Sequence, residues 1–539
     1  MTDAPRQPPT SIDPAGHEAP TIDDPRQRRA VLIAVCVALM AVIASVTGLN
    51  VAQPELAVEF DASQSTVLWF INLYTLTLAA LLLPLGALGD RIGRKPVLLT
   101  GLAVFGLANA AAGLATTSEM MLASRFFSGV GAAMIMPVTL AVITSSFPEA
   151  ERAKGIGVWT AVGGGGGLLG MYLSAVLVDL ASWRWLFALP IALVVIAAAM
   201  VVRSVPNSRE TTEHAFDTIG ALTSGTAVLG LIYALHEGPV HGWTEPLTAV
   251  ALTLGLLNAA AFIARELRHQ APLLDVRLFR TRNLTNGSLS LLAIFGVQAG
   301  IMVVLFPFLQ AVVGWSALRS TLAILPMALL MMASAGLAPY AAARLGRRNT
   351  MATGIFLVGA GLALMAALVS VEDGYLSILP GLLTMGLGMG LAMTPATEAI
   401  TSSLPRERQG VASALNDVTR EAGTAVGVAL LGAVLSAGYR NSIDDQLSDL
   451  PPDVAESARE GLANAVAAAD GAGTRADALV RAAQDSFIDG WQQAMLIGTA
   501  VMATLLVYVL VRTPRDQVTV PESAGTTPAT TPTDSQHVP

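Results

Sequence analysis

Long runs of apolar residues recur along the whole chain and are separated by polar stretches that are mostly short. Because a helix needs about 20 apolar residues to cross a bilayer, each run predicts a transmembrane helix. About fourteen are predicted, near 30–50, 66–88, 97–116, 119–143, 155–178, 185–202, 217–236, 247–264, 285–313, 319–342, 351–370, 375–400, 410–436 and 491–512. The fold class is therefore an all-α polytopic membrane protein whose surface contacts the lipid bilayer.

Composition agrees with this pattern and excludes several classes of function. Of 539 residues, 53% are hydrophobic and 13% charged, which is unlike an ordinary soluble protein. Cys36 is the single thiol, so the chain can form no internal disulfide and no Cys-rich metal site. The sequence contains no nucleotide-binding G-x-x-x-x-G-K-[ST] loop, no metal-ligand cluster and no nucleophile triad with sensible spacing. We expect no enzymatic activity, no cofactor, no metal and no nucleic-acid partner.

Loops rich in cationic residues alternate along the chain with loops that are mainly acidic. The cationic loops lie near 91–95, 152–154, 203–209, 265–282, 344–348 and 406–408, and the short loops between these are the acidic ones. The positive-inside rule then predicts a multi-pass protein of the cell (plasma) membrane with both termini in the cytoplasm.

A weak internal repeat suggests how the helices are grouped. Residues 343–349 (ARLGRRN) match residues 90–96 (DRIGRKP), although Ala343 stands where the first copy has Asp90. Two repeated halves with a substrate site between them are typical of alternating-access transporters. The predicted parts are a disordered tail at 1–29, six helices at 30–203, two inserted helices and a linker at 204–282, six helices at 283–512, and a disordered tail at 513–539.

One outer loop, 439–490, is long, polar and rich in alanine, with helical periodicity after Pro451 and again after Gly473. Two interpretations remain open. The loop forms amphipathic helices that cap the outer face, or it is a lid that binds a partner or funnels substrate.

The turn between the second and third predicted helices is short, cationic and rich in glycine. Two of its glycines permit a tight turn and close backbone approach, its acid can pair with a cation or a helix N-terminus, and its cations are expected to hold the turn in the cytoplasm. The candidate gating residues are Gly86, Asp90, Arg91, Gly93, Arg94 and Lys95. The turn resembles the loop between spans 2 and 3 of major facilitator superfamily transporters, G-x-x-x-D-R-x-G-R-[RK].

Residues from about 30 to 512 resemble the fourteen-span drug:H⁺ antiporters of that superfamily, which export multiple drugs and quaternary ammonium compounds. Residues 69–76 (WFINLYTL) look like the family's W-x-x-x-x-Y-x-L run, and residues 183–187 (WRWLF) look like its W-R-W-x-F. The resemblance implies a major facilitator fold of two six-helix repeats plus two inserted helices. It also implies proton-coupled efflux, but Ser45 occupies the place where the family usually has an acid in span 1, and the antiporter pattern of span 5 is degraded.

Charged side chains inside a membrane helix are costly and usually functional. The family resemblance implies that Arg125 faces the interior of the N-terminal half, and we expect it to act in coupling. Asp417, Arg420 and Glu421 stand at i, i+3 and i+4, so they share one helix face and leave a net negative charge that can titrate or attract a cation. The alternative is that Arg420 simply neutralises Asp417 and that Glu421 is wetted.

Other residues are candidates for gating or for the substrate cavity. The family resemblance implies that Asp90 caps a helix N-terminus near 409–411 and locks the outward-facing state. Aromatic rings can hold flat or cationic substrates, although rings in membrane helices more often pack or face lipid. The cavity candidates are Trp69, Asn72, Tyr74, Trp159, Tyr172 and Glu398, of which the last is also a candidate gate or surface residue.

The leading hypothesis is a monomeric secondary active transporter that exports small amphipathic or cationic molecules in exchange for protons. A second hypothesis is export of one endogenous metabolite, such as an antibiotic or a siderophore. A third, from another class, is a membrane receptor or scaffold that does not transport and binds a partner through 439–490. Uptake instead of efflux also remains open.

Overall fold

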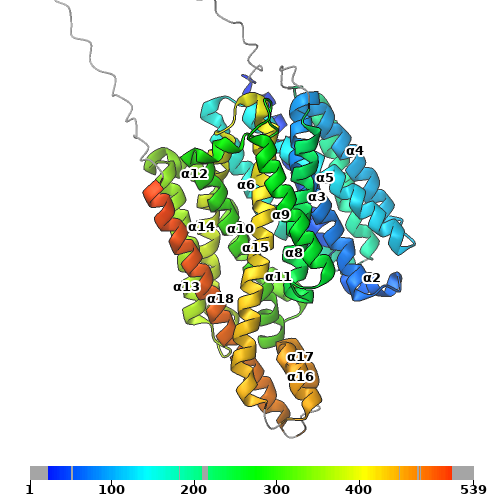
Figure 1. Ribbon diagram of the computed structural model, residues 1–539, viewed down its shortest axis with the longest axis vertical. Helices are drawn as coiled ribbons and strands as arrows, with labels where there is room; N and C mark the ends of the chain where they lie inside the picture. Colours follow the sequence, from blue (N-terminus) through cyan, green and yellow to red (C-terminus); the bar gives the residue numbers. More distant parts are fainter. Residues whose placement is uncertain are drawn as a thin grey trace, which may run out of the picture.

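The computed structural model describes residues 22–49, 52–180, 182–208, 216–447, 450–469, 473 and 475–512. Helices account for nearly all of these residues, and the described part of the chain contains no strand. Figure 1 shows a bundle of long helices with one helical projection at its lower end. The start of α1 and the end of α18 lie at the upper end. We call this upper end the terminal end. We call the lower end the hairpin end, because the chain turns back there through the helical projection.

The first group of helices forms the N-terminal half. Its elements are α1 (Pro25–Gly48), α2 (Gln53–Glu59), α3 (Gln64–Ile92), α4 (Arg94–Gly113), α5 (Ser118–Ser146), α6 (Glu149–Leu180), the 3₁₀ turn η1 (Trp183–Phe187) and α7 (Ala188–Ser204). Helix α1 begins inside the predicted tail 1–29, because Asp24 accepts a hydrogen bond from the Arg26 amide and Pro25 fits the first helical turn. The remainder of both predicted tails, 1–21 and 513–539, lies outside the described residues.

Two inserted helices and a linker follow. They are α8 (Thr218–His241), α9 (Pro246–Glu266) and the turn η2 (Val276–Arg280). Side chains cap both helices: Asp217 accepts from the Gly220 amide at 2.8 Å and Glu245 accepts from the Thr248 amide at 2.7 Å. Helix α8 packs against α3 and α15, one from each half, whereas α9 packs chiefly on α8.

The remaining helices form the C-terminal half. They are α10 (Arg282–Pro307), the π-helical turn η3 (Phe308–Val312), α11 (Ala317–Ala323), α12 (Leu325–Leu345), α13 (Arg347–Leu368), α14 (Tyr375–Thr401), the turn η4 (Arg406–Arg408), α15 (Gln409–Ile443), the turn η5 (Asp444–Gln446), α16 (Pro452–Glu460), α17 (Leu462–Ala468) and α18 (Ala476–Arg512). Glycines allow close helix contacts here. A methyl group on Gly427 of α15 would overlap the Gly296 carbonyl of α10, so these two backbones touch.

Thirteen helices in the described chain are long and apolar enough to cross a membrane. Helix α6, at 32 residues, is a further long helix that packs on α1 and α12, and it matches the predicted span near 155–178. The all-α polytopic prediction is confirmed. Each half has its own apolar core, one built mainly from residues 22–205 and the other mainly from residues 284–509.

The chain between α15 and α18 forms the projection at the hairpin end (Figure 1). Both flanking helices are longer than their apolar runs predict: α15 continues to Ile443 and α18 begins at Ala476. The Tyr439 hydroxyl donates to the Ala458 carbonyl at 2.8 Å, and Arg459 pairs with Asp444 at 2.8 Å. Helix α16 is therefore anchored to the end of α15, and α17 packs on α16 and α18.

Candidate functional site

The tight turn between α3 and α4 holds a buried ion pair. Gly93 has φ +122°, a conformation that side chains rarely adopt, and it reverses the chain in one residue. The Arg94 guanidinium donates to Oδ1 of Asp90 through Nη2 at 2.7 Å and Nε at 3.1 Å. Both side chains are only 2% exposed. Two charges are buried together here, which is tolerated because each has further partners.

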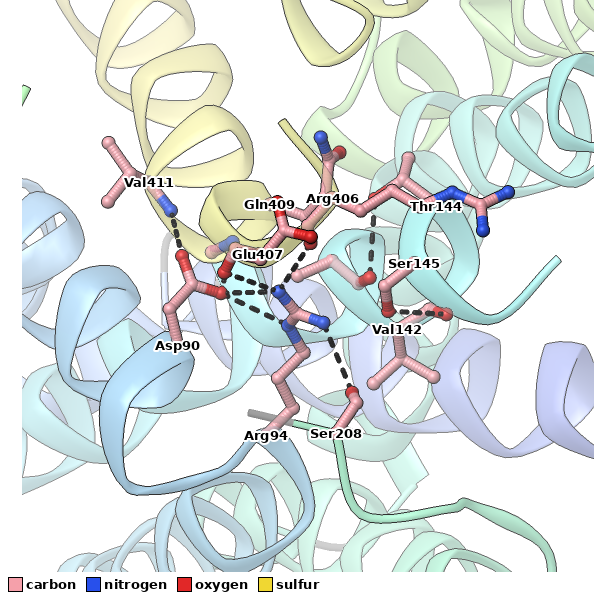
Figure 2. A network of polar contacts seen from close by, with 12 residues as sticks. Asp90, Arg94, Val142, Thr144, Ser145, Ser208, Arg406, Glu407, Gln409 and Val411 are labelled. Carbon is pink, nitrogen blue, oxygen red and sulfur yellow. Dashed lines mark hydrogen bonds and ion pairs between the residues drawn. The ribbon is translucent and has the colours of Figure 1, made fainter. Parts of the chain in front are cut away.

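The partners of Asp90 lie across the molecule, at the start of α15. Its Oδ1 accepts from the Gly410 amide at 2.8 Å and its Oδ2 from the Val411 amide at 3.0 Å (Figure 2). The first amides of a helix have no partner within that helix and carry its positive dipole end, so a carboxylate is favourable there. Asp90 therefore caps α15 and joins the two halves at the terminal end, where the sequence places its partner.

Arg94 completes the junction. Its Nη2 donates to the Arg406 and Glu407 carbonyls, both at 3.0 Å, and its Nη1 donates to the Ser208 hydroxyl at 3.1 Å (Figure 2). We call the set of Asp90, Arg94, the 406–407 carbonyls and the 410–411 amides the terminal clasp.

Three other residues of the predicted gating loop also have definite places. Arg91 is exposed, and Lys95 donates to the Val202 carbonyl at 2.8 Å. A methyl group on Gly86 would lie 2.6 Å from the Gly410 carbonyl, so Gly86 permits the close contact of α3 with α15. Arg94 is 1% exposed, because Asp90, the 406–407 carbonyls and the Ser208 hydroxyl enclose its guanidinium.

A second polar cluster lies within the N-terminal half, around Arg125 of α5. Its Nε donates to the Phe70 carbonyl at 2.9 Å and its Nη1 to the Ser45 hydroxyl at 3.1 Å. The Ser45 hydroxyl in turn lies 3.1 Å from Oδ1 of Asn109. Arg125 is fully buried, and no carboxylate in the described part of the chain forms an ion pair with it. Its charge is instead stabilised by the ring of Tyr74, 4.4 Å away.

The third cluster lies on α15, where Asp417, Arg420 and Glu421 share one face. Oδ1 of Asp417 lies 3.5 Å from Nη1 of Arg420 and accepts from the Asn416 amide group at 3.1 Å. Glu421 is close enough to interact electrostatically with both. We call these three residues the α15 triad. Oδ2 of the fully buried Asp417 has no hydrogen-bond partner among the described residues.

Aromatic rings from both halves lie beside Arg420 of the triad. The Arg420 guanidinium lies 4.4 Å from the ring of Phe295 on α10 and 5.5 Å from the ring of Trp159 on α6. Glu421 also interacts electrostatically with Tyr74, the residue beneath Arg125. Tyr74, whose ring lies against Arg125, is therefore also near the α15 triad.

The family model for the Major Facilitator Superfamily matches residues 34–428. The chain belongs to the major facilitator superfamily. It is therefore a membrane transporter and not an enzyme, and the predicted family and fold are confirmed.

Relatives with curated descriptions narrow the comparison. The chain is 32% identical over 464 residues to the "Multidrug efflux pump LfrA" of Mycolicibacterium smegmatis, covering 86% of this chain and 90% of that protein. It is 29% identical to the "Tetracenomycin C resistance and export protein" of Streptomyces glaucescens, covering 87% and 89%. Among solved structures, the human organic anion transporter MFSD10 superposes with a TM-score of 0.59 at 15% identity, covering 89% of this chain and all of that one, which shows a shared fold.

The cavity candidates of this superfamily member have mixed environments. Tyr74 is fully buried, and Trp159 is 1% exposed and donates to the Thr139 hydroxyl at 3.1 Å. The Trp69 ring stacks on Tyr233 of α8, with centroids 5.9 Å apart. In this conformation the three rings contact neighbouring helices, and their part in a substrate cavity stays a prediction.

The other cavity candidates are more accessible. Asn72 of α3 and Glu398 of α14 are partly buried, and Tyr172 of α6 is 37% exposed. Among the described residues, no group of three His, Cys, Asp or Glu side chains is arranged to hold a metal ion.

Sequence reasoning missed Asn109, although a lone amide in an apolar helix is a signal for a buried polar contact. It also missed Ser208, whose hydroxyl contacts Arg94 from the segment after α7. The sequence around Ser208 carries no comparable signal.

Proposed function

We propose that this transporter is a secondary active exporter that exchanges protons for amphipathic, often cationic, small molecules by alternating access. The α15 triad carries the proposal. With both acids ionised its net charge is −1, and burying that charge is costly. One proton, or one monovalent cationic substrate, neutralises it. Proton and substrate therefore compete for the same charge, which is the requirement for exchange.

The terminal clasp supplies the conformational part of the proposal. It joins α3, α4 and α15 at the terminal end, and we assign this end to the cytoplasm because its loops carry most of the arginines. On that assignment both termini are cytoplasmic, the protein lies in the plasma membrane, and the described conformation is closed toward the cytoplasm. Opening inward requires Asp90 to leave the α15 N-terminus and Arg94 to leave its carbonyl partners.

Export is supported by the relatives, because one is described as a multidrug efflux pump and another as an antibiotic resistance and export protein. The second description favours the alternative that this chain exports one endogenous metabolite. Breadth of the substrate profile distinguishes the two. We propose that the protein acts as a monomer, since each half contributes one side of the triad's surroundings.

The test uses purified protein in liposomes with an imposed proton gradient and ethidium as the reporter substrate. Wild type is expected to accumulate ethidium against its gradient in exchange for protons. Asp417→Asn and Glu421→Gln are expected to abolish gradient-driven accumulation, because each variant mimics the protonated triad and removes the charge for which proton and ethidium compete. Asp485→Asn in α18, an acid outside the triad, is the matched control. Gradient-driven transport at the wild-type rate in both triad variants would contradict the proposal.

A further inference from the structure

A hollow at the terminal end of α9 is lined by side chains that no part of the transport mechanism uses. Its volume is about 400 Å³, and its lining residues are Ala264, Arg265, Arg268 and His269. Arg268 is exposed, and the side chains of Arg265 and His269 are 29% and 32% exposed. The hollow is therefore open to the surface and lined by three basic side chains.

The carboxylates nearby are turned inward. Asp217 accepts from Nε of Arg265 at 2.8 Å and from the Gly220 amide, so it is committed to capping α8. Glu266 is 1% exposed and accepts from the Leu274 amide at 3.0 Å. In the described chain no acid pairs with Arg268. The side of the hollow that faces outward is therefore cationic.

The linker adds to this positive charge. Arg277, Arg280 and Arg282 are exposed, and Nη2 of Arg277 donates to the Leu267 carbonyl at 2.7 Å, which holds η2 beside the end of α9. Asp275 caps η2 through the Arg277 amide. Arg277 thus adds positive charge beside the hollow.

Below the hollow the surface is apolar. Helix α9 packs chiefly on α8, and its other face exposes leucine, valine and isoleucine side chains. They are Leu247, Val250, Leu254, Leu256, Leu257 and Ile263. In a membrane this face is covered by acyl chains, and it ends directly at the basic hollow. A ligand with an anionic phosphate above two apolar chains matches this surface.

We propose that the hollow binds the phosphate headgroup of an anionic phospholipid, with its acyl chains along the exposed face of α9. The Arg268 and Arg265 guanidiniums contact the phosphate, since arginine binds phosphate oxygens through paired N–H donors. Basic surfaces of membrane proteins near the headgroup layer are known lipid-binding features, and each cation contributes roughly a fivefold gain in affinity. The inference needs only that the chain spans a membrane and holds whichever way substrate moves.

The test measures lipid binding to the delipidated full-length protein by native mass spectrometry. Phosphatidylglycerol is the anionic probe, phosphatidylcholine the zwitterionic probe and inorganic phosphate the soluble competitor. Wild type is expected to bind phosphatidylglycerol in preference to phosphatidylcholine. Arg268→Gln is expected to weaken phosphatidylglycerol binding about fivefold. Arg203→Gln, which removes another exposed arginine at the same end, is the matched control and is expected to leave binding unchanged.

Three outcomes would overturn the proposal. An equal loss of phosphatidylglycerol affinity in Arg268→Gln and Arg203→Gln would mean that general surface charge attracts the lipid. Equal binding of the two lipids would mean that the acyl chains alone decide the contact. Displacement of phosphatidylglycerol by millimolar inorganic phosphate would mean that the hollow is a soluble-anion site without a contribution from α9.

Discussion

The guanidinium carbon of Arg125 lies 4.4 Å from the ring centre of Tyr74, and the same tyrosine interacts electrostatically with Glu421 across the interface between the halves. A buried arginine without a carboxylate partner needs compensation. Here a ring face, a carbonyl and a hydroxyl supply it within the N-terminal half. Arg125 and the α15 triad lie in different halves of the chain, and Tyr74 is near both.

The first prediction concerns Ser45, whose hydroxyl lies 3.1 Å from Nη1 of Arg125. Ser45→Asp should replace a neutral acceptor of that cation with a carboxylate and stabilise the protein by about 1 kcal/mol, because a hydrogen bond between two ionised groups is stronger than one with a neutral acceptor. Thermal unfolding of the purified protein measures this effect. Ser45→Asn is the control, because it offers an acceptor of similar shape without charge. An equal or lower Tm for the Asp variant than for the Asn variant would contradict the role assigned to Arg125.

The sequence predicts the positions of helices better than the contacts between helices that are distant in sequence. Apolar runs locate the helices to within several residues, since span length is set by the bilayer. The largest difference is at α18, which begins at Ala476 instead of near 491. Residues 476–490 are polar and lie beyond the apolar run, yet they continue the helix because Leu479, Ala483 and Phe487 pack against the outer projection.

Contacts between distant helices are harder to predict. The family resemblance correctly places Asp90 at the start of α15. Local sequence cannot show that Arg94 turns inward, because the carbonyls that bind it are more than 300 residues away. It likewise cannot show that Trp69 stacks on Tyr233, since the partner lies in an inserted helix with its own apolar pattern.

The second prediction tests the terminal clasp. Asp90→Asn removes the negative charge that binds Arg94 and the α15 amides, so it should weaken closure of the terminal end by about 2 kcal/mol, or roughly 30-fold in population. Ser413 of α15 is fully buried, three residues after Gly410, and can report this change. In a Cys36→Ala background, a cysteine at position 413 should be labelled by a maleimide much faster when Asp90→Asn is present. Arg91→Gln, a change at an exposed neighbour, should leave the labelling rate unchanged. An unchanged labelling rate and unchanged transport kinetics in the Asp90 variant would contradict the proposal that Asp90 holds the terminal end closed.

A third prediction follows from the close contact of α3 with α15. The added methyl group of Gly86→Ala would lie 2.6 Å from the Gly410 carbonyl and 2.7 Å from the Ala414 side chain, and backbone atoms cannot move away cheaply. Closure of the terminal end should therefore be disfavoured, and ethidium transport in liposomes should fall at least tenfold. Gly336→Ala on α12 is the matched control, because nothing lies within 4 Å of its added methyl group. Similar transport rates in the two alanine variants would show that this contact does not limit the cycle.

The fourth prediction concerns the inserted helices. The Trp69 and Tyr233 rings stack with centroids 5.9 Å apart and an interplanar angle of 26°, and they join α3 to α8. Offset aromatic pairs contribute about 0.5–1.5 kcal/mol beyond their buried area. In a double-mutant cycle of Trp69→Ala and Tyr233→Ala, the unfolding free energies should be non-additive by about that amount. The pairing of Trp69→Ala with Tyr375→Ala, a tyrosine whose ring packs against a different tryptophan, serves as the control and should be additive. Additivity in both cycles would mean that the burial of apolar area alone holds α8 to α3. The inserted pair would then have no specific ring contact with the N-terminal half at this position.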